Sequence, residues 1–183
     1  MLSRTGRFRR RCARGLFGPV ALGWLLVPGA ASAFERQWHV GGGAGLVSPA
    51  SPYKSGGALA LHAAHGVSDV FDVRLELRSS LHEAREAGQS RNTLSQGALA
   101  LVYKIDVIEW VPYIGVRAGY YYLFGTPPAA SLTRSGGMLG TLLGCDYAFS
   151  RSAAVGAELA YDTWLPEGSA VGMLLHAEYR WGW

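Results

Sequence analysis

Cysteine and lysine are both scarce in this sequence, and their scarcity excludes several classes of protein. The 183 residues include two cysteines, Cys12 and Cys145, and two lysines, Lys54 and Lys104. A small disulfide-stapled domain needs several cysteine pairs, and the usual structural zinc site needs closely spaced cysteine or histidine ligands. We therefore expect a fold that is stable without disulfides and that binds no metal.

Motifs of nucleotide-dependent and metal-dependent enzymes are also absent from the sequence. It contains no HExxH, no P-loop and no nucleophile elbow. The glycine-rich run GGGAG at 41–45 opens no helical pattern, so it does not indicate a dinucleotide site. These absences favour a protein that is not an enzyme and that holds no cofactor.

The N-terminal segment has the composition of a secretory signal peptide. Residues 1–15 carry six arginines and no acidic residue, and the apolar run LFGPVALGWLLVPGA follows them. The small residues Ala31 and Ala33 then match an A-x-A cleavage site. We expect a signal peptide at 1–33 and Phe34 as the first mature residue. A transmembrane anchor is the alternative, but the run is short and two prolines interrupt it.

Removal of this signal peptide changes the charge balance of the chain. The whole sequence has 17 basic and 13 acidic residues, and the leader holds six of the basic and none of the acidic ones, which leaves 11 against 13. The basic character of the full sequence therefore belongs to the leader, and we expect no nucleic-acid partner. The remaining residues, 34–183, suffice for one domain.

Hydrophobic residues in this domain recur at every second position, a period that predicts β-strands. The clearest example is VFDVRLELRSSL at 70–81, where alternate residues from Phe71 to Leu77 are apolar and the residues between them are charged. The segments predicted to be strands are 37–47, 57–66, 70–81, 93–105, 111–124, 136–147, 153–162 and 170–183.

The connections between these segments alternate in length. The short ones are 66–69, 106–110 and the stretch around 149–151, and the longer ones are 48–56, 82–92, 125–135 and 163–169. Short turns at one end and longer loops at the other are what an antiparallel barrel with an even number of strands requires. The fold class that we predict is all-β, an eight-stranded antiparallel up-and-down barrel.

The second face of the strands distinguishes a membrane barrel from a soluble sandwich, which also alternates. Outside the third and eighth segments that face is mostly glycine and alanine, whereas strand positions that face water usually carry lysine, glutamate and threonine. Small residues suit a narrow lumen. Tryptophan and tyrosine also fall near the segment ends, where headgroups would lie. We therefore predict a transmembrane barrel, with a soluble periplasmic barrel or sandwich as the alternative.

The charged residues of the strands fall on this same small-residue face. An arginine that faces the hydrocarbon near the midplane would cost about 2–4 kcal/mol, so the charges are expected inside the barrel. Both signs are present, and they can pair. The residues predicted to form a lumen charge network are Arg74, Glu76, Arg78, Arg117, Glu158, Asp162, His176, Glu178 and Arg180.

With these features the chain resembles the small eight-stranded outer-membrane barrels of Gram-negative bacteria, the OmpA/OmpX type. The resemblance covers 34–183 and rests on the signal peptide, on GVSDVFDVRLEL, on WVPYIGVRAGYYY and on the terminal LLHAEYRWGW. It implies an outer-membrane location, contact with outer-membrane lipid and lipopolysaccharide, and a monomer. In this family the assembly machinery reads alternate apolar residues that end on an aromatic one, normally phenylalanine. The matching residues are Leu175, Ala177, Tyr179, Trp181 and Trp183.

Three functions follow as hypotheses. The first is a non-enzymatic surface barrel with four loops, whose lumen is plugged because glutamates hold Arg74, Arg117 and Arg180; the polar network would then replace an apolar core. The second is a narrow channel through the same groups. The third is a lipid-A-modifying enzyme, with His176 and Glu178 as base pair and a serine as nucleophile. The serines considered are Ser79, Ser80 and Ser95.

Overall fold

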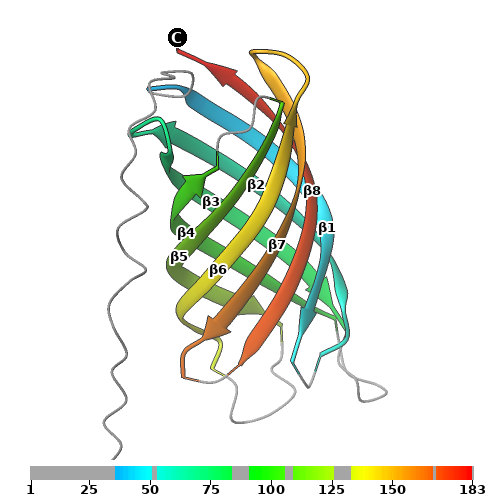
Figure 1. Ribbon diagram of the computed structural model, residues 1–183. Coiled ribbons are helices and arrows are strands. Elements are labelled where there is room, and N and C mark those ends of the chain that lie inside the picture. Colours follow the sequence, from blue (N-terminus) through cyan, green and yellow to red (C-terminus); the bar gives the residue numbers. More distant parts are fainter. Residues whose placement is uncertain are drawn as a thin grey trace, which may run out of the picture. The chain divides into compact units, whose positions relative to one another are not determined.

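The computed structural model describes residues 36–50, 53–83, 91–105, 109–125, 133–166 and 168–182. Eight strands close into one barrel, in which each strand pairs antiparallel with its neighbours in sequence and β8 pairs with β1 (Figure 1). The prediction of an eight-stranded up-and-down barrel is confirmed. The strands are β1 (Trp38–Pro49), β2 (Gly56–Gly66), β3 (Phe71–His82), β4 (Asn92–Lys104), β5 (Trp110–Phe124), β6 (Ser135–Ala148), β7 (Ala153–Trp164) and β8 (Ser169–Trp181).

The barrel has two different ends. We call the end that carries the β1–β2, β3–β4, β5–β6 and β7–β8 connections the loop end, and the opposite end the turn end. At the turn end the β2–β3 turn is tight, because the backbone N–H groups of Val67 and Ser68 both donate to the carbonyl of Phe71. At the loop end Gly168 adopts a φ of 124°, a conformation that favours glycine, and its carbonyl accepts from the N–H of Trp164.

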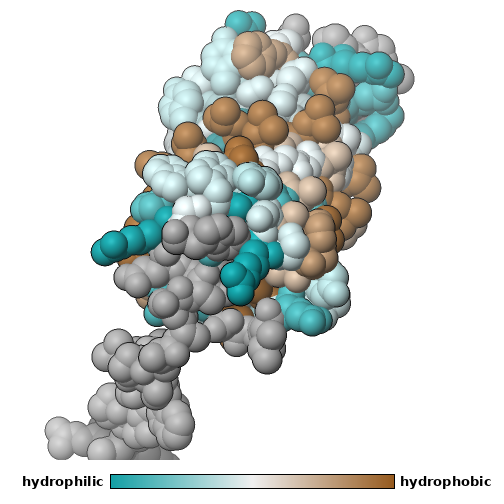
Figure 2. Space-filling view, turned by 90° about the horizontal axis from the view of Figure 1, so that it is seen from above, coloured by the Kyte–Doolittle hydropathy of each residue, from teal (hydrophilic) through white to brown (hydrophobic). Residues whose placement is uncertain are grey.

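The outer face of the barrel is apolar. Along β3 buried and exposed residues alternate without a break, and its exposed residues from Phe71 to Leu77 are all hydrophobic. Figure 2 shows apolar side chains spread over the flank of the barrel. Near the turn end the aromatic rings form pairs, such as Trp110 with Tyr147 and Tyr179 with Trp181. Among the described residues no helix is long and apolar enough to cross a bilayer.

The inner face contains more large apolar side chains than the sequence led us to expect. One cluster lies toward the loop end and includes Tyr121, Leu123, Met138 and Trp164. A second, smaller cluster is centred on Tyr113 of β5. The expectation that a polar network replaces an apolar core was therefore wrong, because the lumen has both.

Glycines on the inner face make room for these large side chains. A Cβ atom on Gly144 of β6 would lie 2.2 Å from Cζ of Tyr113, which is its register partner on β5. The absence of a side chain at this position lets the tyrosine ring lie against the backbone of β6. Small and large residues thus alternate around the lumen, as the interior of a narrow barrel requires.

Candidate functional site

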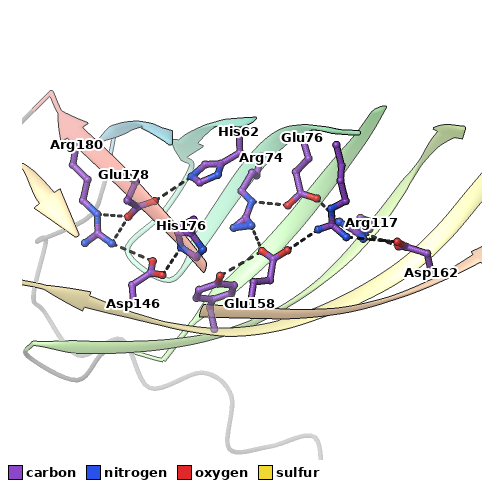
Figure 3. A network of polar contacts seen from close by, with 12 residues as sticks. His62, Arg74, Glu76, Arg117, Asp146, Glu158, Asp162, His176, Glu178 and Arg180 are labelled. Atoms are coloured by element: carbon purple, nitrogen blue, oxygen red, sulfur yellow. Dashed lines mark hydrogen bonds and ion pairs between the residues drawn. The ribbon is translucent and has the colours of Figure 1, made fainter. Parts of the chain in front are cut away.

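The candidate site is a network of charged side chains that crosses the lumen. Three strands supply its central part. Arg74, Glu76 and Arg78 follow one another at every second position of β3, so all three point inward. Arg117 comes from β5, and β7 contributes the two remaining residues of this part, Glu158 and Asp162. Strand alternation therefore places residues that are far apart in sequence around one small volume (Figure 3).

The central part is tied together by short, charge-assisted hydrogen bonds. Arg117 donates through Nη1 to Glu76 Oε2 at 2.6 Å and through Nε and Nη2 to the two oxygens of Asp162 at 2.8 and 2.6 Å. Arg74 donates through Nε to Glu76 Oε1 at 2.7 Å and through Nη2 to Glu158. Each carboxylate thus accepts from at least one guanidinium, and the contacts join β3 to β5 and β7 across the lumen.

Arg78 completes this central part. Its Nη2 donates to Glu158 Oε1 at 3.0 Å, and its Nη1 lies 3.8 Å from Asp162. The phenol of Tyr113 also donates to Glu158, at 3.4 Å. Glu158 is therefore the carboxylate that two arginines and one tyrosine share.

A second part of the network lies toward the turn end, around Arg180 and Glu178 of β8. Arg180 donates to Glu178 and also to Asp146 Oδ2 of β6 at 3.2 Å. His176 Nε2 lies 2.9 Å from Asp146 Oδ1, and His62 Nε2 lies 3.4 Å from Glu178 Oε2. The rings of His62 and His176 meet edge to face with centroids 5.6 Å apart. Histidines therefore contact both carboxylates of this part.

Several charged residues of the lumen were missed in the sequence. Asp146 contacts Arg180 and His176, and Lys104 Nζ lies 2.8 Å from Asp72 Oδ2 at the turn end. His39 Nδ1 lies 3.6 Å from Glu178 Oε1. A signal for these residues was available, because each lies an even number of positions from an inward residue of its own strand. Asp146, for example, follows Gly140 and Gly144 on β6.

The lumen network is buried and close to neutral. Arg117, Glu158 and Asp162 are 4%, 4% and 2% exposed, so water screens their contacts little. Among the described residues, the buried charged side chains comprise six carboxylates and five cations. Removing one partner from such an arrangement typically costs about 3–5 kcal/mol, because the other charge is left buried without compensation.

Little space remains between these side chains. One cavity, lined in part by His62, Arg74, Glu76 and Glu158, has a volume of about 20 Å³. A second cavity of about 20 Å³ lies among Asp72, Lys104, Tyr113 and Arg180. Each is large enough for about one water molecule. Within the described part of the chain no group of three or more potential ligands is placed to hold a metal ion.

The catalytic arrangement of the third hypothesis, the lipid-A-modifying enzyme, does not form. His176 contacts Asp146, while Ser79 and Ser95 lie on the outer face and contact each other at 3.3 Å. The hydroxyl of Ser80 does point inward, but its partner is His82. The structure therefore brings none of the three serines to the His176–Glu178 pair.

The alternate residues of the last strand all face outward. Leu175, Tyr179 and Trp181 are 66%, 56% and 40% exposed, and Ala177 is exposed between them. Trp183 lies outside the described residues. So does the predicted signal peptide with its cleavage site at Ala31, Ala33 and Phe34.

A closed eight-stranded barrel with an apolar exterior and ion pairs inside is the architecture of the small outer-membrane β-barrels. The fold and the apolar exterior together make this chain an outer-membrane β-barrel protein that contacts lipid. No model of a known protein family matches the sequence, and no curated protein matches it.

Solved structures share the fold at low sequence identity. Neisserial surface protein A is 15% identical with a TM-score of 0.66, over 78% of this chain and 96% of that chain. The outer membrane protein OprG of Pseudomonas aeruginosa is 14% identical with a TM-score of 0.62, over 81% and 97%. Ail, the attachment invasion locus protein of Yersinia pestis, is 16% identical with a TM-score of 0.59, over 80% and 99%.

Proposed function

We propose that this protein is a closed surface barrel, which contributes to envelope integrity or to contacts outside the cell and conducts no solute. The observation that carries this proposal is the set of ion pairs from β3 to β5 and β7, with cavities of about 20 Å³ between them. A conducting pathway needs a continuous line of water or weak binding sites. The tight pairing of Arg74 and Arg117 with their carboxylates favours a plug, and a structural role for these charges rather than a catalytic one.

Planar-bilayer recording tests whether the lumen conducts. The purified, refolded wild-type barrel should give no discrete current steps. Arg117→Ala, which removes the side chain that joins Glu76 to Asp162, is the variant in which leakage should first appear. Lys54→Ala changes a loop charge away from the plug and should remain silent. Discrete steps from the wild-type protein that shift on Arg117→Ala would instead support a narrow channel.

We further propose that the loop end faces outward from the cell. The three longest connections, β1–β2, β3–β4 and β5–β6, belong to this end, and barrels of this class place longer loops on the extracellular side. The prediction of a longer connection at 163–169 was wrong, because β7 ends at Trp164 and β8 begins at Ser169, which leaves a connection as short as the β2–β3 turn. A membrane-impermeant maleimide applied to intact cells provides the test, in a Cys145→Ser background. Lys54→Cys at the loop end should be labelled, whereas Ser68→Cys in the β2–β3 turn should react after lysis alone. Labelling of Ser68→Cys in intact cells would show that the turn end, and not the loop end, faces outward from the cell.

Lipopolysaccharide is the partner that we propose for the loop end. Lys54 and Arg91 have side chains that are 57% and 80% exposed, and they contact Oε2 and Oε1 of Glu83, respectively. Exposed cations near a membrane surface attract anionic headgroups, and the phosphates of lipopolysaccharide carry that charge. The protein Ail, which shares this fold, was solved with the heparin analogue sucrose octasulfate. Retention on immobilised lipopolysaccharide should fall with salt and in Lys54→Ala/Arg91→Ala, but not in Arg151→Ala at the turn end.

The same structure supports proposals for assembly and oligomeric state. The outward-facing apolar residues of β8, Leu175, Tyr179 and Trp181, are the group that the outer-membrane assembly machinery would read. Because the barrel is closed, no strand edge among the described residues is left open for pairing with a second copy. We therefore expect a monomer in detergent, which light scattering coupled to size-exclusion chromatography measures.

A further inference from the structure

A serine and a histidine at the loop end form a pair that is separate from the charge network. Ser80 and His82 lie two residues apart on the inner face of β3, with exposures of 1% and 2%. Ser80 Oγ and His82 Nε2 are 2.8 Å apart. Nε2 is therefore the side of the imidazole that meets the serine hydroxyl.

The other ring nitrogen of His82 determines the direction of this hydrogen bond. His82 Nδ1 lies 3.1 Å from the backbone carbonyl oxygen of Lys54. A carbonyl oxygen accepts and never donates, so Nδ1 carries the proton and Nε2 of the neutral ring is the acceptor. The Ser80 hydroxyl then donates to Nε2, and its longer contact with the Leu94 carbonyl, at 3.4 Å, is the weaker one. A hydroxyl bound to a base that a third group orients is the arrangement of an activated serine nucleophile.

His82 also lines an apolar pocket at the mouth of the barrel. Leu94, Tyr121, Leu123 and Trp164 form its walls, and Ser80 lies next to the wall through its contact with the Leu94 carbonyl.

Tyr53 also lines the pocket. Its ring centroid lies 6.1 Å from that of His82, and the remaining cavity has a volume of about 20 Å³. Tyr53 belongs to the β1–β2 connection rather than to a strand of the barrel. Burial raises its pKa to about 12, so the phenol stays neutral in these surroundings. A ligand larger than water therefore needs a lining side chain such as Tyr53 to move, and the apolar walls favour an apolar group in that space.

We propose that Ser80 and His82 are the catalytic pair of an esterase that accepts small esters with an apolar acyl group at the loop-end mouth. Ser80 Oγ attacks the ester carbonyl and passes its proton to His82 Nε2. His82 returns that proton to the departing alcohol as the C–O bond breaks, which leaves an acyl-serine. Water then attacks the acyl group with His82 as base, releasing the acid and restoring Ser80. This activity would be additional to the role proposed for the lumen charges, and it uses none of them.

A fluorophosphonate probe on the refolded, full barrel tests the proposal, with the adduct located by mass spectrometry. Wild-type protein should be labelled at Ser80, Ser80→Ala should not react, and His82→Gln should react at least about 100-fold more slowly, the usual contribution of a general base. Ser79→Ala is the matched control, because Ser79 is the adjacent residue and faces outward. It should label like the wild type.

Hydrolysis of p-nitrophenyl butyrate should follow the same order, and Tyr53→Ala should be faster than the wild type because it opens the mouth. Slower migration of each variant after boiling shows that the unboiled protein was folded. Two results would overturn the proposal. One is the absence of a Ser80 adduct in both wild type and Tyr53→Ala. The other is labelling of Ser80 in folded His82→Gln at the same rate as in the wild type, because the reactivity of the hydroxyl would then not depend on the histidine.

Discussion

Replacement of Arg117 by alanine should destabilise the barrel more than any loss of an exposed ion pair. Arg117 donates three hydrogen bonds, one to Glu76 and two to Asp162. After its removal Glu76 still contacts Arg74 Nε at 2.7 Å, whereas the remaining cation near Asp162 is Arg78, whose Nη1 lies 3.8 Å from Oδ2. Asp162 therefore becomes the stranded charge, and we expect a loss of about 3–5 kcal/mol in the free energy of unfolding.

The assay is urea unfolding of the barrel refolded in lipid vesicles, followed by tryptophan fluorescence. If stranding of Asp162 is the cause, Arg117→Met/Asp162→Leu should recover most of the loss, because both charges leave together. Arg117→Met/Glu76→Gln should recover less. Arg91→Ala, in an exposed pair with Glu83, should change stability by about 0–1 kcal/mol. A loss below about 1 kcal/mol in Arg117→Ala, or no recovery in the Asp162 double variant, would refute the reasoning.

Three further predictions follow from the packing and from the outer face. Gly140→Ala should lower the free energy of unfolding by about 1–3 kcal/mol, because the new Cβ would lie 2.8 Å from the Tyr161 carbonyl oxygen and 2.3 Å from Asp162 Oδ1. Gly137→Ala on the same strand is the control, because its Cβ would meet its nearest atom at 3.9 Å, and it should leave stability unchanged in the same unfolding assay. Leu75→Arg places a cation on the lipid side of β3 and should cost about 2–4 kcal/mol in vesicles, and an unchanged unfolding midpoint would contradict a lipid-facing position. Tyr179→Ser/Trp181→Ser should lower the amount of barrel in the outer membrane of intact cells, measured by heat-modifiable migration, while Lys54→Ala leaves it unchanged.

The strand pattern could be predicted from sequence because lipid and lumen act on alternate residues. Every strand bound lies within two residues of its prediction, and the inward direction of Arg74 or Glu158 needed only the parity of its position. The large apolar residues of the interior were harder to find. Tyr121 has the same parity as Arg117 on β5, so its inward direction was available from the sequence, whereas Trp164 lies within the predicted loop 163–169, where alternation assigns no face.

The partners of individual side chains could not be predicted. Which arginine meets which carboxylate depends on the stagger of strands around the closed barrel, and alternation along one strand carries no information about it. The contact between Ser80 and His82 was missed for a different reason. Both residues lie on β3, but the predicted strand ends at 81, so His82 falls in the predicted loop 82–92. The contact between Tyr53 and His82 joins a loop to a strand end and has no pattern in the sequence at all.

In this barrel the apolar face of the strands contacts lipid, and the ionic face is enclosed. Spin labels on Leu61→Cys and Leu75→Cys, in a Cys145→Ser background and in bilayers, test it directly. Power saturation should show high accessibility to oxygen and almost none to a water-soluble nickel chelate at both sites, because both side chains lie on the outer face. High nickel accessibility at either site in a folded barrel would contradict the claim, since that face would then be in water.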